Sequence, residues 1–152
     1  MVSSIFLLLI LCIASCKKDK ASSHIGFSIK LSDKPLDTIK KYIQGKWKFE
    51  YSFGGIANTN YYPPNGYIGY SLFTANNRVY ATSNGIVDAD ATIKWIRVRG
   101  VTQGDEDSTY TMSYYNKQNL PWGFVIVGIS NDTLIYHDYS SDAMFYHLSK
   151  SN

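Results

Sequence analysis

The spacing of apolar residues changes twice along the chain. Residues 5–14 are an almost unbroken apolar run, and residues 17–34 are polar and mixed, without a strong period. Residues 36–43 carry apolar side chains at helical spacing, with Pro35 suited to a first helical turn and Gly45 suited to a stop. The pattern therefore predicts one short helix between a polar N-terminal stretch and whatever follows Gly45.

After Gly45 the period falls to two. Trp47, Phe49, Tyr51 and Phe53 alternate with polar residues, which is typical of a strand with one buried face. The same alternation, interrupted by turn residues, predicts eight strands in series, as in an up-and-down barrel or a sandwich. The predicted strands are residues 46–53, 67–74, 78–82, 91–99, 109–115, 123–129, 133–139 and 143–149.

Composition supports an all-β fold in a single domain. The chain has 152 residues, of which 45% are hydrophobic and 18% charged, so it can bury a core of its own. Thirteen Tyr and seven Phe are a high aromatic share, and aromatic side chains suit half-buried pleated surfaces. We therefore expect an eight-stranded up-and-down antiparallel barrel preceded by one short helix.

The positive net charge of the chain lies outside its predicted barrel. Residues 17–42 carry seven Lys against three Asp, a net charge of +4, whereas residues 43–152 carry a net charge of −1. A nucleic-acid-binding domain needs a basic face on its folded part, so the sequence gives that function no support. The basic stretch suits a solvated linker that touches anionic headgroups.

The N-terminal residues predict a secreted, lipid-anchored protein. The apolar run of residues 5–14 is too short for a bilayer-spanning helix and fits the core of a secretory signal. Ile13-Ala14-Ser15-Cys16 resembles the bacterial lipobox, which implies lipidation at Cys16. The alternatives are a plain secretory signal with an incidental Cys, or an uncleaved anchor.

This interpretation divides the chain into three parts. We expect a signal peptide over residues 1–15, a lipidated tether over 16–34 and the barrel over 35–152. A short alternating patch over residues 25–31 is compatible with an extra edge strand. Because Cys12 would leave with the signal and Cys16 would carry the lipid, no thiol remains for a disulfide, a metal site or a nucleophile.

The start of the first strand carries a family resemblance. The predicted helix followed by Gly45-Lys46-Trp47 resembles the Gly-x-Trp signature of lipocalins. With the lipobox, the eight strands and the Asn131-Asp132-Thr133-Leu134 turn, the chain resembles lipocalin-like lipoproteins of the Bacteroidetes type. The resemblance covers roughly residues 36–150, and Lys150 stands where classical lipocalins carry an Arg after the last strand.

The resemblance implies a barrel that is closed at the end holding the helix and Trp47 and open at the other. Chain order then places the loop over residues 57–66, with Tyr61 and Tyr62, at the mouth. The stretch around Asp88 and Asp90, predicted as a loop, falls at the same end. The tether would lie at the opposite end, so the mouth would point away from the membrane.

Two interpretations of the barrel interior stay open: a filled aromatic core, and a pocket for one small ligand with tyrosine hydroxyls as polar handles. The predicted inward face includes Trp47, Phe49, Tyr51, Tyr70, Leu72, Trp95, Tyr110, Met112 and Tyr136. Tyr61, Tyr62 and Trp122 suit stacking on sugar rings as well as packing of the rim. The candidate ligand-binding residues are Tyr51, Tyr61, Tyr62, Tyr70, Trp95, Tyr110, Met112, Trp122 and Tyr136.

The sequence offers no catalytic or metal-binding motif. It lacks Gly-x-Ser-x-Gly, a Walker loop and His-Glu-x-x-His, so we expect no enzyme activity and no cofactor. His137 and His147 fall on strands expected to pair, but a zinc site needs three or four ligands. Asp88-x-Asp90 lacks the ligand spacing of a calcium loop and suits turn chemistry.

These expectations combine into one functional hypothesis. The chain is expected to be a monomer held on the cell envelope by its N-terminal lipid, in the outer membrane, with the leaflet left open. Its barrel would bind a small apolar or amphipathic ligand. The alternative is a packed barrel without a pocket, acting as a surface interaction or inhibitor module through its aromatic mouth loops.

Overall fold

The computed structural model describes residues 28–99 and 108–152, which form one antiparallel sheet and one helix. The helix, α1, spans Leu36–Ile43 and confirms the predicted helix. The all-β prediction is also confirmed. The strands are β1 (Ile29–Lys30), β2 (Gly45–Gly54), β3 (Thr59–Tyr61), β4 (Gly69–Phe73), β5 (Arg78–Ser83), β6 (Ile86–Thr92), β7 (Lys94–Arg99), β8 (Ser108–Tyr115), β9 (Pro121–Ser130), β10 (Thr133–Asp138) and β11 (Met144–Ser151).

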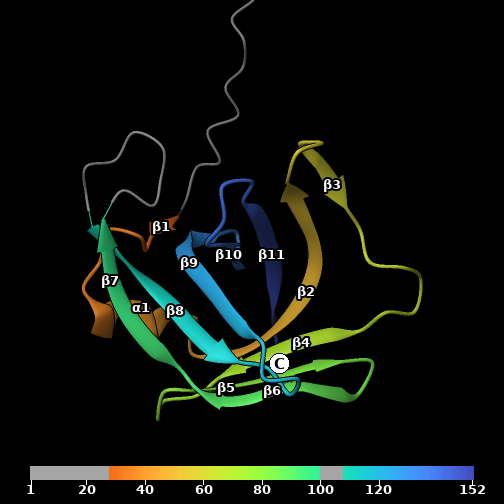
Figure 1. Ribbon diagram of the computed structural model, residues 1–152, viewed down its shortest axis with the longest axis horizontal. Helices are drawn as coiled ribbons and strands as arrows, with labels where there is room; N and C mark the ends of the chain where they lie inside the picture. The colour runs from red at the N-terminus through yellow and green to blue at the C-terminus, as the bar shows by residue number, and fades with distance from the viewer. Residues whose placement is uncertain (1–27, 100–107) are drawn as a thin grey trace, which may run out of the picture.

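The sheet is a strongly curled meander in the order β6-β5-β4-β2-β11-β10-β9-β8-β7. β11 pairs with β2, so the last strand lies beside the first long one. β6 and β7 occupy opposite edges of the sheet order, although Ile93 alone separates them in the chain. Figure 1 shows the resulting curvature, with β7 and β8 on the left facing β2 and β3 on the right.

The strand register defines two ends of the curled sheet. At the helix end, Gly45 pairs with Phe73, and the next residue, Lys46, pairs with Ser151. At the mouth end, Gly54 pairs with Met144. The loop that carries Tyr61 and Tyr62 belongs to the mouth end, as predicted from chain order.

The first described residues lie at the helix end. Ile29 pairs with Ile129 of β9, and the Asn131 amide donates a hydrogen bond to Ser28 Oγ at 3.5 Å. The short β1 is the extra edge strand that the alternation between residues 25 and 31 suggested. Residues 16–27 of the predicted tether, Cys16 included, lie outside the described residues.

The helix end is filled by a packed apolar core. Leu31, Ile39, Ile43 and Trp47 are all buried, so β1 and α1 cover the base of the sheet. The Trp47 indole donates a hydrogen bond from Nε1 to the Ile43 carbonyl oxygen at 2.6 Å. This bond fixes the end of α1 against the first long strand and satisfies one of the helix's terminal carbonyls.

Two stretches predicted as loops contain strands. Ile86–Thr92 forms β6, paired with β5, and Thr59–Tyr61 forms β3. The prediction missed β6 because Asp88 and Asp90 are poor strand formers, and backbone pairing with β5 outweighs that preference. Asn84 and Gly85 both have positive φ and make the two-residue turn that sets this register.

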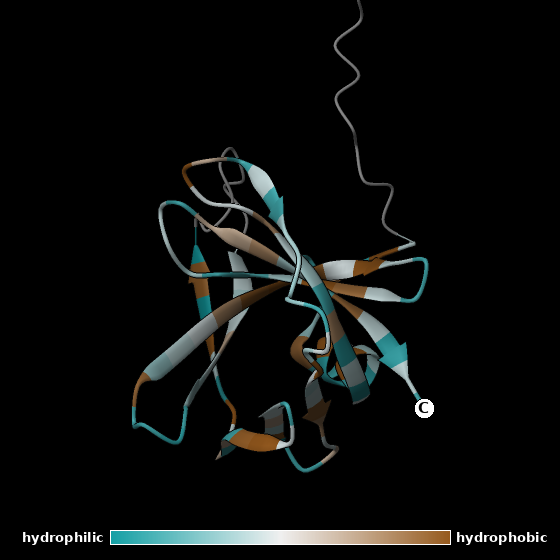
Figure 2. Cartoon of the chain, turned by 90° about the vertical axis from the view of Figure 1, so that its right-hand side faces the viewer, coloured by the Kyte–Doolittle hydropathy of each residue, from teal (hydrophilic) through white to brown (hydrophobic). Residues whose placement is uncertain are grey.

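A bulge in β2 overturns part of the predicted inward face. The register between β2 and β11 shifts between His147 and Leu148, so Glu50 is an extra residue and Tyr51 pairs with His147. Tyr51 therefore leaves the face that Trp47 and Phe49 occupy. Figure 2 shows bands of higher and lower hydropathy alternating along the strands.

Leu72 was also predicted to face inward, and this was wrong. It pairs with Lys46 in the register of β2 and β4 and is 37% exposed. Ser71 and Phe73 face the core instead, because Ser71 pairs with the buried Trp47. The error arose because the polar Ser71 occupies an inward position and the apolar Leu72 an outward one.

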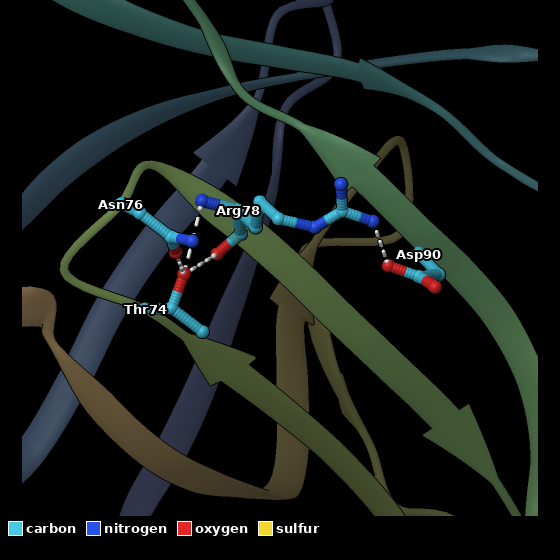
Figure 3. A network of polar contacts seen from close by, with 4 residues as sticks. All are labelled: Thr74, Asn76, Arg78 and Asp90. Carbon is cyan, nitrogen blue, oxygen red and sulfur yellow. Dashed lines mark hydrogen bonds and ion pairs between the residues drawn. The ribbon is translucent and has the colours of Figure 1, made fainter.

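The turn between β4 and β5 and the adjoining outer face are held by polar contacts (Figure 3). The Arg78 amide donates to Thr74 Oγ1 at 3.2 Å, and Asn76 accepts from the same hydroxyl. Arg78 also forms an ion pair with Asp90 of β6 at 2.5 Å. The hydrogen bond from Arg78 lowers the pKa of Asp90, so this carboxylate stays ionised, and the guanidinium balances its charge on the outside of the sheet.

Candidate functional site

A cavity of about 760 Å³ lies between the curled halves of the sheet, at the mouth end. This volume is within the range of small-molecule sites, roughly 300–1,000 Å³. Its lining includes Tyr67, Ser83, Trp122 and Asp138, which are all mouth-end residues. The cavity therefore opens at the end away from α1.

The cavity exists because its two walls differ in side-chain size. On β4 and β5 the lining residues of the inward face are small: Gly69, Ser71, Ala81 and Ser83. Tyr70 and Thr82 also border the cavity, but they pair with each other on the outward face. The opposite wall, on β2 and β8–β11, is aromatic. Its lining rings are Phe49, Tyr114, Trp122, Phe124, Tyr136 and Tyr146. Large side chains on one wall meet small ones on the other, and the space between them stays open.

The aromatic wall is a continuous set of ring contacts. Phe124 lies 4.9 Å from Tyr136 and 5.8 Å from Tyr146, measured between ring centroids, and both pairs are close to edge-to-face. Tyr114 meets Trp122 edge to face at 5.8 Å. Such pairs are favoured geometries for aromatic rings and fix their orientation. The wall is therefore a preformed surface of ring faces and edges.

The tyrosines of this wall are neutral. Burial raises the pKa of Tyr114 and of Tyr136, and nearby tyrosines raise both further. Burial also raises the pKa of Tyr146, assisted by Asp138. These phenols keep their protons through the physiological range, so they act as hydrogen-bond donors and not as anions.

A second bulge turns Asp88 into the cavity. Ala81 pairs with Ala89 and Thr82 pairs with Val87, so Asp88 is the extra residue of β6. Its Oδ2 accepts a hydrogen bond from Ser83 Oγ at 2.5 Å. Simple alternation would place Asp88 and Asp90 on the same face. The bulge sends the first inward and leaves the second exposed beside Arg78.

Tyr67 continues this polar row. Its hydroxyl lies 2.9 Å from Ser83 Oγ, which bridges it to Asp88. The Tyr67 ring passes over Gly69, where an added Cβ would come within 2.9 Å of Tyr67 Cε1. A glycine is therefore required at position 69 for the ring to take this place at the mouth.

Asp138 is the second carboxylate of the lining. Its Oδ1 accepts hydrogen bonds from Ser140 Oγ at 2.9 Å and from the Met144 amide at 3.0 Å. It also interacts with the Tyr146 hydroxyl and thereby helps to raise the pKa of that phenol. These bonds hold the carboxylate at the end of β10, against the aromatic wall.

The structure separates the nine predicted ligand-binding residues into two groups. Tyr70, Trp122 and Tyr136 line the cavity. Tyr70 borders it through its main chain, because its ring lies on the outer face under the Lys46 ammonium, 4.2 Å from the ring centroid. Residues outside the lining are Tyr51, Tyr61, Tyr62, Trp95, Tyr110 and Met112.

Those six residues have other surroundings. Met112 is fully buried in the core, with Trp95 and Tyr110 packed against it. Tyr51 stacks on His147 at 4.2 Å on the outer face. Tyr61 and Tyr62 lie on the exposed segment after β2, and Tyr62 packs against Tyr51 at 5.5 Å. A filled core and an open cavity therefore coexist, one at each end of the sheet.

Sequence reasoning missed most of the cavity lining. Tyr114 and Tyr146 fall on the inward face of their strands by alternation, so the period-two pattern contained that signal. The period-two pattern could not place Asp88 on the inward face, because the bulge decides which way its side chain points. Asp138 ends a strand, where a carboxylate usually indicates a turn.

The described residues contain no cluster of three or more His, Cys, Asp or Glu side chains with the geometry to hold a metal ion. His137 and His147 do lie on neighbouring strands, where His147 pairs with Ile135 and His137 pairs with Phe145. His137 Nδ1 lies 2.7 Å from the Asp138 carbonyl oxygen. Their surroundings are apolar and aromatic, as expected for histidines that pack against a sheet.

Comparison with known proteins identifies no relative. No family model, curated protein or solved structure matches the chain. Within residues 28–99 and 108–152, no helix has both the length and the apolar character needed to cross a bilayer.

Proposed function

We propose that this chain is a lipid-anchored cell-envelope protein whose lipocalin-like barrel binds a small amphipathic ligand in the mouth-end cavity. The observation that carries the proposal is the cavity itself, about 760 Å³ bounded by an aromatic wall and a row of hydroxyl and carboxylate groups. Rigid apolar walls with a few convergent polar groups are characteristic of small-molecule sites.

Two features support the lipocalin-like part of the proposal. If β6 and β7 are counted as one strand bent at Ile93, the long strands of the meander number eight, with β11 beside β2. At the helix end, the Lys150 ammonium lies 4.5 Å from the Trp47 ring centroid. A cation at the end of the last strand that covers the Gly-x-Trp tryptophan suits the resemblance.

Ligand binding can be tested on the full chain by ¹⁵N NMR in phospholipid nanodiscs, which add no free detergent that could occupy the cavity. The chain has three Trp, so it gives three indole signals. Trp122 lines the cavity, whereas Trp47 and Trp95 donate their indole protons to Ile43 and Asn77. A neutral probe such as tert-butylbenzene should shift the Trp122 indole signal and leave the other two in place.

Ala81→Phe supplies the matched variant for this titration. Ala81 belongs to the small wall, and a phenyl ring there would occupy the space opposite Tyr136. The variant should abolish the shift at Trp122 while preserving the indole signals of Trp47 and Trp95. If no neutral or amphipathic probe perturbs Trp122 in the unmodified chain, ligand binding in this cavity is ruled out.

The lipid anchor is tested separately. Incorporation of a palmitate analogue in cells should label the chain, and Cys16→Ser should remove the label. Label that persists in Cys16→Ser, or its absence from the unmodified chain, would contradict the anchor without bearing on the cavity. Native mass spectrometry of chain purified from its own type of membrane would then show whether a small molecule travels with it.

A second function, interaction through the mouth, is favoured by the apolar rim. Large apolar side chains are exposed on every mouth-end loop: Ile56, Tyr61, Tyr62, Ile68, Ile86, Tyr115, Leu120 and Tyr139. Contiguous exposed apolar surface marks contact sites. A photo-crosslinker at Leu120 should capture a partner if the rim is an interface, whereas one at Tyr80, on the outer face of β5, should not.

A further inference from the structure

The cavity combines aromatic walls with negative charge and contains no positive charge of its own. Among the described residues that line it, Asp88 and Asp138 are charged, and none is Lys, Arg or His. Asp90 differs from these two carboxylates, because it faces outward and forms an ion pair with Arg78. The described lining of the cavity therefore carries two carboxylates and no cationic side chain.

The aromatic wall adds to this polarity. The faces of aromatic rings are the negative part of their quadrupole and attract a cation within about 6 Å of the ring centroid. Tyr114 and Tyr136 contribute two of the rings that line the cavity. Anions gain nothing from these walls and are repelled by both carboxylates.

Asp88 is not saturated by protein donors. Its Oδ2 accepts from Ser83, and Oδ1 has no hydrogen-bond donor among the described residues. The side chain lines the same cavity as Tyr114, so the carboxylate lies near the aromatic wall. A charge near an apolar wall costs free energy unless it is paired, and a bound cation would supply the partner.

We infer that the cavity selects small organic cations: a quaternary or protonated amine carried on an aromatic or branched aliphatic body. The ammonium group lies between the aromatic wall and the two carboxylates, and the apolar body fills the space beside Ser71 and Ala81. This inference rests on the proposed function, because it names the ligand class of the same cavity. It narrows the expected ligand from an apolar or amphipathic molecule to a cationic one.

The test compares two probes of the same shape in the ¹⁵N NMR titration of the full chain. Phenyltrimethylammonium carries a positive charge, and tert-butylbenzene is its neutral counterpart. The cation should shift the Trp122 indole signal, and benzenesulfonate should not. Asp88→Asn combined with Asp138→Asn should weaken binding of the cation by about tenfold or more, while the affinity of tert-butylbenzene stays within about twofold.

Asp90→Asn is the matched control, because it removes the same charge from the other face of β6. It should leave both affinities unchanged, and each single variant, Asp88→Asn or Asp138→Asn, should show part of the loss. The Trp47 and Trp95 signals report whether a variant is folded. If the double variant is unfolded, the single variants carry the test.

Each remaining outcome is decisive. If tert-butylbenzene shifts Trp122 and phenyltrimethylammonium does not, the cavity binds ligands but does not select cations, and the inference is overturned while the proposed function stands. Equal losses in the cavity variants and in Asp90→Asn would also overturn it. If neither probe shifts Trp122, the inference fails, and larger amphipathic probes decide the proposed function.

Discussion

The ammonium of Lys150 lies over the ring of Trp47, 4.5 Å from its centroid, and donates a hydrogen bond to the Gln44 carbonyl oxygen at 3.0 Å. One side chain from the last strand therefore joins the end of α1 to the start of β2. Lys150 Nζ also lies within 2.8 Å of where a Cβ at Gly45 would sit. The Gly-x-Trp segment thus leaves room for this cation.

Lys150→Met should lower the free energy of unfolding by about 0.5–1 kcal/mol, because it removes an exposed cation–π contact. Lys150→Arg should retain most of that free energy, since a guanidinium also stacks on an indole. Urea denaturation followed by tryptophan fluorescence measures both. Lys94→Met is the control, because Lys94 is also an exposed strand lysine, and equal losses at the two positions would contradict the specific role of Lys150.

Two threonines of β8 give opposite predictions for the same substitution. Thr109 and Thr111 are both buried, but Thr111 Oγ1 donates to the Ile96 carbonyl oxygen at 3.1 Å. Thr109 Oγ1 has no hydrogen-bond partner among the described residues. Thr109→Val should raise the free energy of unfolding by about 1 kcal/mol, and Thr111→Val should lower it by a similar amount. Equal changes in the free energy of unfolding for Thr109→Val and Thr111→Val would contradict this prediction.

The order of the elements could be predicted from the sequence because the strands alternate strictly over most of their length. Val79 and Ala81 point into the core and Tyr80 points out, as the period-two pattern requires. The Asn84-Gly85 and Asn131-Asp132 turns both use positive φ angles, which short polar side chains and glycine tolerate. The alternation of side chains and the turn residues were therefore enough to predict the order of these strands.

The composition of the cavity could not be predicted, because two bulges decide which side chains enter it. The bulge at Glu50 turns Tyr51 away, and the bulge at Asp88 turns an acid inward. A bulge depends on how two strands pair, and a single strand's sequence does not contain that information. The sequence predicts an apolar or amphipathic ligand because the inward aromatic residues are visible in the pattern and the inward carboxylate is not.

His147 should make stability depend on pH. Burial lowers the pKa of His147 below its ordinary value of 6.5, so the unfolded chain binds a proton there more readily than the folded one. The stabilising contribution is therefore complete above about pH 6.5 and is lost as the pH falls through 6.5 toward the lowered value. Urea midpoints at several pH values between 5 and 8 measure this trend.

His147→Phe is the matched variant, because phenylalanine can keep the stack with Tyr51. It should flatten the dependence of the urea midpoint on pH across this window while retaining stability at pH 8. An unchanged pH dependence in His147→Phe would assign the trend to other groups. Tyr51→Phe, which preserves the ring and removes only the hydroxyl, should leave the trend as it is.

Trp122 and Tyr61 were both predicted at the rim of the barrel, but the structure indicates that they contribute differently to stability. The Trp122 ring packs against Tyr114 and Phe124, at centroid distances of 5.8 and 6.3 Å, whereas Tyr61 is 45% exposed. Trp122→Ala should therefore lower the free energy of unfolding by about 2–3 kcal/mol, below the loss of a fully buried aromatic. Tyr61→Ala should stay within about 0.5 kcal/mol.

Urea denaturation followed by circular dichroism measures both variants without relying on the tryptophan that is removed. Trp122→Phe serves as the control, because it keeps an aromatic ring against Tyr114 and should recover more than half of the loss. Comparable losses in Trp122→Ala and Tyr61→Ala would mean that the loop after β2 supports the fold as much as the aromatic wall does. A negligible loss in Trp122→Ala would mean that the indole is free to move, and the wall of the cavity would then not be preformed at that position.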